Sequence, residues 1–182
     1  MPLHDDAPPS EWVRRWARLI PERGRVLDVA CGRGRHARYL SGLGHEVVGV
    51  DRDPEARTVL EGVRGVSVLV ADIEGGPWPF EAAGFDAIVV TNYLHRPLFP
   101  RFLEALREPG VLVYETFAMG NERYGRPGNP EFLLQPDELL ERTRPLRPVA
   151  FEQGQVERPK RAVIQRICAV SEGWPRPLPD AS

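Results

Sequence analysis

Residues 25–51 read RVLDVACGRGRHARYLSGLGHEVVGVD, and this stretch decides how the chain folds. Its first part, residues 26–30, is mostly apolar and predicts a short buried strand. Two glycines follow at once, Gly32 and Gly34, and residues 35–41 then have helix-forming character. Residues 46–50 predict a second strand, which ends at Asp51. Strand, glycine turn, helix, strand and acid, in this order, indicate the first βαβ unit of a nucleotide-binding sheet.

The glycine turn and the acid after the second strand are suited to one kind of ligand. Gly32 and Gly34 lack a Cβ, so the chain can turn tightly and a ligand can lie close to the backbone. The helix that follows directs its free N–H groups and the positive end of its dipole towards that ligand. Asp51 stands where a carboxylate can accept hydrogen bonds from both hydroxyls of a ribose. A ligand with an adenosine and an anionic end fits these features.

The residue that separates one adenosine ligand from another is Asp28, four positions before Gly32. The spacing alone is ambiguous, because Gly32, Gly34 and Ala37 satisfy the permissive form of the dinucleotide pattern. A carboxylate that faces a pyrophosphate would repel it. The same carboxylate would attract the ammonium group of a methionine moiety, directly or through water. Asp28 therefore favours S-adenosylmethionine (SAM) over a dinucleotide.

The string LDVACGRGR at residues 27–35, followed by Tyr39 and Leu40, closely resembles the first motifs of class I SAM-dependent methyltransferases. It is most similar to the small bacterial branch that includes tellurite- and thiopurine-type enzymes. The resemblance covers about residues 25–170 and implies direct methyl transfer from SAM to a nucleophile. The cofactor contacts that it implies are Asp28, Ala30, Gly32, Gly34, Asp51, Arg52, Asp72, Ile73 and Asn92. In this family, Asp72 would accept the adenine amino group and the Ile73 backbone would meet the ring.

The remaining chain predicts further alternation of helices and strands. Residues 66–71, 85–90 and 111–117 are predicted as strands, with a turn at residues 109–110. Predicted helices cover residues 11–20, 54–61, 97–106 and 137–142. Two strand-like runs, residues 147–156 and 161–170, then follow each other so closely that they must be antiparallel. We therefore predict an α/β, Rossmann-like doubly wound, mostly parallel sheet that ends in an antiparallel β-hairpin, which is the class I methyltransferase fold.

Ligands of an open α/β sheet bind outside the carboxyl ends of its strands, so Asn92, Tyr93 and His95 are candidates for the reactive face. Residues 118–136 form a long loop rich in Gly, Pro and Asn, which predicts a cover over the substrate. The loop contains Tyr124, Arg123 and Arg126, which could hold a small aromatic or anionic acceptor. His95, Tyr93 and Tyr124 are the candidate catalytic residues, with His95 the first choice for a general base.

Composition indicates a protein of ordinary globular type. The 182 residues fit a single domain, carry a formal net charge of −2 and contain two cysteines. Within that domain, residues 1–24 are expected to form a helix or lid and residues 172–182 a flexible tail. No apolar run long enough for a membrane span, no signal peptide and no metal-ligand cluster is evident, so we expect a cytoplasmic protein without a metal. The charge does not favour nucleic acid as a partner, and the oligomeric state is left open.

Two other classes of function compete with a small-molecule methyltransferase. An NAD(P)-binding oxidoreductase would share the glycine turn, but Asp28 and the terminal hairpin argue against it. A non-catalytic SAM-binding protein would share every cofactor residue, so the sequence leaves it open. A nucleic-acid enzyme is a variant of the leading interpretation. It is disfavoured by residues 91–94, TNYL, which lack the Asp/Asn-Pro-Pro-aromatic motif of enzymes that methylate DNA amino groups.

Overall fold

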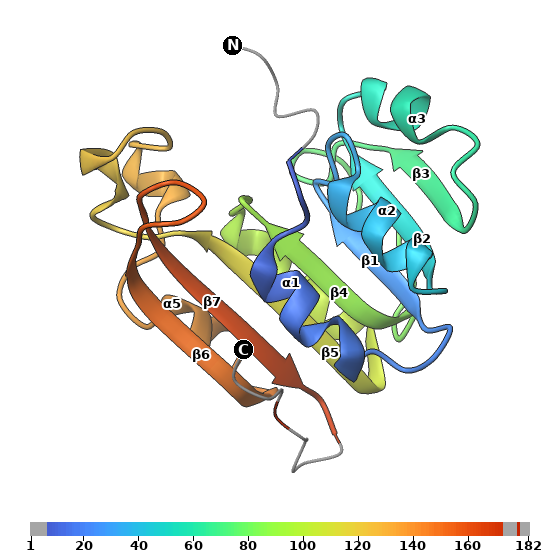
Figure 1. Ribbon diagram of the computed structural model, residues 1–182. Helices are drawn as coiled ribbons and strands as arrows, with labels where there is room; N and C mark the ends of the chain where they lie inside the picture. Colours follow the sequence, from blue (N-terminus) through green and yellow to red (C-terminus); the bar gives the residue numbers. More distant parts are fainter. Residues whose placement is uncertain (1–6, 173–177, 179–182) are drawn as a thin grey trace.

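The computed structural model describes residues 7–172 and residue 178, and its centre is one seven-stranded sheet (Figure 1). The strands are β1 (Arg25–Val29), β2 (Glu46–Asp51), β3 (Val66–Val70), β4 (Phe85–Thr91), β5 (Leu106–Phe117), β6 (Arg147–Val156) and β7 (Ala162–Val170). The α-helices are α1 (Glu11–Trp16), α2 (Arg35–Gly42), α3 (Glu55–Leu60), α4 (Phe99–Ala105) and α5 (Glu138–Arg142). Short 3-10 helices are η1 (Ala17–Leu19), η2 (Arg96–Leu98), η3 (Asn121–Arg123) and η4 (Pro130–Phe132).

The strand order is β3-β2-β1-β4-β5-β7-β6, which confirms the predicted topology. Strands β1 to β5 pair in parallel, whereas β7 runs antiparallel to both β5 and β6. The order reverses between β1 and β4, because the chain first builds outward to β3 and then returns to the other side of β1. Ligands of such sheets bind at that reversal, outside the carboxyl ends of the strands.

The helices cover the two faces of the sheet and bury one hydrophobic core on each side (Figure 1). Along β1 the side chains alternate, so Val26 packs towards α1, α2 and α3 while Leu27 packs towards α4 and α5. Trp12 and Trp16 of α1 are fully buried on the first face, and Phe99 and Phe102 of α4 on the second. The two layers hold the carboxyl ends of the central strands in fixed positions.

Three details differ from the sequence predictions. The first helix ends at Trp16 and continues as the 3-10 helix η1, so it is shorter than residues 11–20. The helix predicted to reach residue 106 ends at Ala105, and β5 begins at Leu106 instead of residue 111. The turn predicted at residues 109–110 therefore lies inside β5, where the strand is irregular. Leu106 pairs with Phe85 and Val111 with Ala87, so the segment between them bulges out of register.

Two further predictions concern the chain ends. The expected flexible tail at residues 172–182 lies almost wholly outside the described residues, as does the start of the expected lid at residues 1–24. In the part of the chain that is described, no helix is long and apolar enough to cross a lipid bilayer.

Candidate functional site

The two glycines of the turn after β1 have different roles in the structure. Both have a left-handed backbone, with φ of 51° at Gly32 and 77° at Gly34. A Cβ on Gly34 would overlap the side chain of Leu60, so this glycine allows α2 to pack closely against α3. A Cβ on Gly32 would meet nothing within 4 Å. The backbone at Gly32 therefore borders open space, where a ligand can approach it.

Asp51, the last residue of β2, ties the second strand to the glycine turn. Its Oδ2 accepts a hydrogen bond of 2.8 Å from the Gly32 N–H, and its Oδ1 accepts one of 2.9 Å from the Asp53 N–H. An ionised carboxylate has about four lone-pair positions, so it can accept further hydrogen bonds from a ligand. These contacts fix Asp51 beside Gly32 before any ligand binds.

Asp28 is a buried carboxylate whose charge is not fully compensated. It is 1% exposed, and its Oδ2 has no hydrogen-bond partner. Burial raises its pKa to about 7, against the opposing effects of the Ala37 backbone N–H and the Arg35 guanidinium. Leaving a buried carboxylate oxygen without a donor is costly, so this site favours the arrival of a cation nearby. An ammonium group on a ligand at the glycine turn would supply one.

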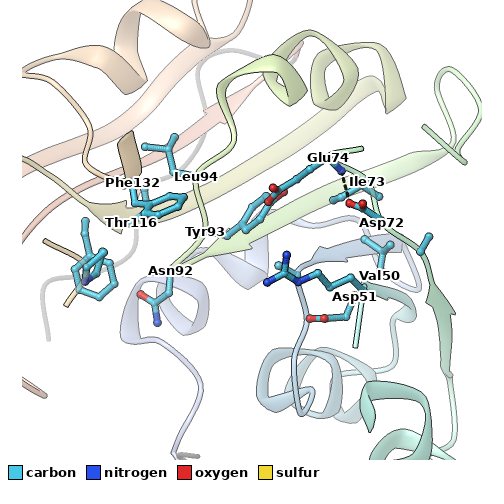
Figure 2. A pocket seen from close by; sticks show the side chains of 15 residues that line it. Val50, Asp51, Asp72, Ile73, Glu74, Asn92, Tyr93, Leu94, Thr116 and Phe132 are labelled. Atoms are coloured by element: carbon cyan, nitrogen blue, oxygen red, sulfur yellow. Dashed lines mark hydrogen bonds between the residues drawn. The ribbon is translucent and has the colours of Figure 1, made fainter. Parts of the chain in front are cut away.

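A cavity of about 330 Å³ opens at the carboxyl ends of the central strands (Figure 2). It is lined by Ala30, Val50, Asp51, Arg52, Ala71, Asp72, Ile73, Glu74, Asn92, Tyr93, Leu94, Thr116, Phe117, Pro127 and Phe132. In Figure 2 the charged residues Asp51, Asp72 and Glu74 lie towards one end, and Thr116 and Phe132 lie towards the other. We call these the charged half and the apolar half of the cavity.

Asp72 is positioned at the charged half by a turn of the backbone. Its Oδ1 accepts hydrogen bonds from the Glu74 N–H at 3.0 Å and the Gly75 N–H at 3.1 Å. These bonds, that of Gly75 first, hold the pKa of Asp72 below its ordinary value. The carboxylate is therefore ionised at neutral pH and available as an acceptor, and Ile73 next to it supplies an apolar surface.

The structure brings most, but not all, of the predicted site residues to the cavity. The predicted residues that line it are Ala30, Asp51, Arg52, Asp72, Ile73, Asn92 and Tyr93. Asp28, Gly32 and Gly34 do not line it but belong to β1 and the turn at its edge. His95 also lies outside the lining, with its Nδ1 3.9 Å from Oε2 of Glu74.

Tyr124, a predicted site residue, does not line the cavity and instead contacts the β6–β7 hairpin. Its hydroxyl donates a hydrogen bond of 2.6 Å to Oε1 of Gln155 in β6, and the Arg161 guanidinium lies over its ring. The long loop still contributes to the cavity through two other residues, Pro127 and Phe132. The strong polar contact with β6 explains why Tyr124 turns towards the hairpin.

Several lining residues were missed from the sequence. Thr116 and Phe117 end β5, so the rule that ligands lie beyond strand ends could have found them. Phe132 and Pro127 stand in irregular backbone, where no spacing rule predicts which side chain turns inward. Leu94 and Glu74 each come one position after a predicted residue, Tyr93 and Ile73.

The segment before α1 is attached to α2 and to β5. The Ser10 N–H donates a hydrogen bond of 3.1 Å to Nε2 of His36, and the Ser10 hydroxyl donates one of 2.7 Å to Glu115. Arg166 of β7 binds the other oxygen of Glu115 at 3.2 Å. Burial lowers the pKa of His36 to about 3, so its imidazole stays neutral and acts as an acceptor. Both oxygens of Glu115 are thus hydrogen-bonded, and the bond to Ser10 holds the N-terminal segment in place.

Comparison with known proteins agrees with this geometry. Residues 26–109 match the family model described as "Methyltransferase domain". The tRNA U34 carboxymethyltransferase of Methylococcus capsulatus is 32% identical in an alignment 153 residues long, which covers 71% of this chain and 46% of that protein. The chain spans about half the length of the curated relatives it matches, 51% and 46% for two of them.

Solved structures show the same fold at low sequence identity. TehB from Haemophilus influenzae has a TM-score of 0.74 and 20% identity, over 88% of this chain and 61% of that one. The 1,6-didemethyltoxoflavin-N1-methyltransferase of Burkholderia thailandensis, solved with S-adenosylhomocysteine bound, has a TM-score of 0.64 and 20% identity, over 89% and 79% of the two chains. The solved structures show that the fold is that of class I SAM-dependent methyltransferases, and the methyltransferase-domain match over residues 26–109 together with the glycine-turn site supports such an enzyme, with SAM as its cofactor.

Proposed function

We propose that the chain transfers the methyl group of SAM to a small, uncharged aromatic acceptor. The observation that carries this proposal is the division of one cavity into a charged half and an apolar half. The cofactor would occupy the charged half, and the acceptor would approach from the apolar half. Both ligands would then meet where the carboxyl ends of β1 and β4 lie side by side.

The residues of the charged half suit each part of SAM. Asp51 would accept hydrogen bonds from the ribose hydroxyls, while Asp72 and Ile73 would receive the adenine. The open backbone at Gly32 would lie along the methionine part, and Asp28 beneath the turn would balance its ammonium charge. When bound, the cofactor supplies an electrophilic methyl group on a sulfonium, so the chain mainly has to orient the acceptor in line with it.

The apolar half explains why the acceptor should be uncharged. Leu94 and Phe132 line it, with Asn92 and Thr116 as polar groups (Figure 2), and Phe117 and Pro127 also line the cavity. The arginines of the long loop, Arg123 and Arg126, are not among the lining residues. An anion in this half would lose hydration without gaining an ionic partner. The expectation of an aromatic or an anionic acceptor therefore narrows to an aromatic one, which the phenyl rings and one or two hydrogen bonds can orient.

The apolar half also limits the chemistry of proton removal. Among the described residues that line it, none is a histidine, a lysine or a carboxylate. Burial and the neighbouring Glu74 carboxylate raise the pKa of Tyr93, so its hydroxyl stays protonated and does not serve as a base. The acceptor should therefore offer a lone pair that attacks before any proton is lost, such as a ring nitrogen or a thione sulfur. His95 remains the candidate base only if the acceptor extends towards Glu74.

The relatives support two different acceptors. The Burkholderia thailandensis enzyme was solved with 1,6-didemethyltoxoflavin, a small molecule, whereas the Methylococcus capsulatus relative is named for tRNA. A tRNA acceptor would need cations around the cavity to bind phosphates. The formal net charge of −2 and the uncharged apolar half favour the small molecule.

The proposal is tested by a binding screen followed by a turnover screen. Thermal shifts with S-adenosylhomocysteine, SAM, NAD and NADP identify the cofactor, and stabilisation by NAD alone would refute the family assignment of the site. Methylation is then measured with neutral nitrogen heterocycles and thiones, with tellurite and benzoate as anions, and with bulk tRNA. Turnover confined to the anions or to tRNA would refute the acceptor class.

Two exposed side chains of the long loop provide a matched pair of variants for the same screen. Phe132 is 50% exposed and lines the cavity, whereas Met119 is 47% exposed and does not. Phe132→Ala should lower turnover of the aromatic acceptor with little change in the affinity for S-adenosylhomocysteine. Met119→Ala should leave both unchanged, and equal effects of the two variants would remove Phe132 from the acceptor site.

A further inference from the structure

Arg96, at the start of η2, has a side chain that contacts two separate parts of the chain. Its Nε and Nη2 donate to the two oxygens of Glu138, at 2.7 Å and 2.9 Å. Its Nη1 also donates to the carbonyl of Glu131 at 2.7 Å, and Nη2 donates to the carbonyl of Leu133 at 2.9 Å. One guanidinium thus makes four hydrogen bonds in a fork geometry that only arginine provides.

Glu138 fixes the orientation of this guanidinium. Its side chain is 8% exposed, and it also accepts hydrogen bonds from Nε of Arg142 at 2.6 Å and from the Gln135 N–H at 2.9 Å. Burial alone would raise its pKa, but the hydrogen bonds from Arg96, Gln135 and Arg142 lower the pKa to about 2. Glu138 therefore carries its charge at every pH where the protein would work.

The two carbonyls that Arg96 binds belong to the residues on either side of Phe132. The backbone N–H groups of Glu131, Phe132 and Leu133 bond within the loop, to Asn129 and Pro130. Those bonds shape the loop but do not attach it to the sheet. The Leu134 N–H attaches the following residue to the Phe117 carbonyl of β5 at 3.0 Å. The turn around Phe132 itself is attached by Arg96, which follows β4 by only a few residues.

We propose that Arg96 is a positioning residue that holds Phe132 against the apolar half of the cavity. Asn92 and Leu94, on the segment that leads from β4 to Arg96, line the same cavity that Phe132 closes. Arg96 therefore connects two walls of the cavity, one after β4 and one in the long loop. The statement that these walls enclose an acceptor rests on the proposed function. The attachment of the loop by Arg96 is independent of it.

Arg142 offers a matched control for the attachment. It pairs with the same carboxylate of Glu138 as Arg96 does, and its guanidinium lies over the ring of Phe99. The structure shows no bond from Arg142 to the carbonyls of Glu131 and Leu133. Loss of Arg142 therefore weakens the ion pairs of Glu138 and leaves the contacts beside Phe132 in place.

The test measures amide hydrogen exchange in the full chain with S-adenosylhomocysteine bound and no acceptor added. In Arg96→Ala the amides of Phe132 and Leu133 should exchange roughly tenfold faster or more, while those of β1 and β2 keep their wild-type protection. Arg96→Lys keeps a positive charge but cannot reach Glu138 and both carbonyls together. Its exchange at Phe132 and Leu133 should therefore fall between that of the wild type and that of Arg96→Ala. Arg142→Ala should resemble the wild type.

Two results would overturn the assignment. Equal exchange at Phe132 in Arg96→Ala and Arg142→Ala would mean that only the ion pairs of Glu138 matter. Unchanged exchange in Arg96→Lys and Arg96→Ala would mean that the loop is held without Arg96. Because exchange is read without an acceptor, a failed turnover screen refutes the proposed function and leaves this result to stand alone. With an acceptor in hand, Arg96→Ala should raise its KM while the affinity for S-adenosylhomocysteine stays the same.

Discussion

The buried carboxylate of Asp28 predicts that cofactor binding depends on pH in the range just below neutrality. Burial raises the pKa of Asp28 to about 7 in the free protein, so near pH 7 about half of the molecules hold a proton there. An ammonium group at the glycine turn would favour the ionised form and lower this pKa. Binding of S-adenosylhomocysteine should therefore release a proton from Asp28. The binding should be weaker at lower pH, where more molecules hold that proton.

The size of the effect follows from the pKa. At pH 6 about nine-tenths of the Asp28 side chains are protonated, and at pH 8 about one-tenth. If the ligand binds only the ionised form, its Kd should rise roughly tenfold between pH 8 and pH 6. The number of protons released on binding should fall from about 0.9 at pH 6 to about 0.1 at pH 8.

Isothermal titration calorimetry in buffers of different ionisation enthalpy measures both quantities. Asp28→Asn is the reference, since it keeps the size of the side chain and removes the titrating group. Subtracting its proton release removes the contributions of other groups on the protein and on the ligand. At pH 8 the variant should bind S-adenosylhomocysteine more weakly than the wild type by about 1.5–3 kcal/mol, as expected for one charge-assisted contact.

A wild-type protein with the same proton release as Asp28→Asn at pH 6 would refute this reasoning. It would show that Asp28 keeps one protonation state on binding and is a structural residue of β1. The predicted direction of the pH dependence would be refuted if the wild type bound more weakly at pH 8 than at pH 6 by more than Asp28→Asn does.

Three more predictions follow from single contacts. Asp51→Ala should weaken S-adenosylhomocysteine binding in calorimetry by roughly 1.5–3 kcal/mol, while Asp53→Ala next to it should have little effect. Gly34→Ala should lose about 1–2 kcal/mol or more in urea unfolding because of its φ and the overlap with Leu60, whereas Gly42→Ala within α2 should be neutral or stabilising. Glu138→Gln should be less stable than the wild type at pH 7. Because the pKa of Glu138 is about 2 in the folded protein and ordinarily 4.5, that difference should shrink as pH falls from about 5 to 2.

The sequence predicted those features whose causes are local in the chain. Gly32, Gly34 and Asp51 lie within one βαβ unit, and the pairing of β2 beside β1 brings the acid to the turn without any choice of distant partner. The terminal hairpin was predicted because a very short connection leaves only antiparallel pairing. In both cases the chain geometry allows a single solution.

The features that the sequence did not predict depend on contacts between distant positions. Arg96 and Glu138 are 42 residues apart, and no local sequence pattern around either residue predicts that they pair. The placement of Tyr124 is decided by Gln155 on β6, so its loop position alone gave the wrong neighbourhood. The bulge in β5 arises because Leu106 joins Phe85 before the regular register begins at Val111, although Pro109 and Gly110 look like a turn.

Asn92 lines the cavity on the side of Thr116 and Phe132 (Figure 2), and its backbone is strained there. It has a left-handed φ of 54°, and its N–H donates to the Glu115 carbonyl at 2.9 Å. A non-glycine residue in this conformation costs about 1–2 kcal/mol, which suggests that its side chain has a function. Asn92→Gly should therefore be as stable as the wild type or more stable in urea unfolding, and Asn92→Ala should be less stable. Both variants should lose turnover of the aromatic acceptor to the same extent, because both lack the amide. If Asn92→Gly kept full turnover, Asn92 would serve only to turn the chain after β4.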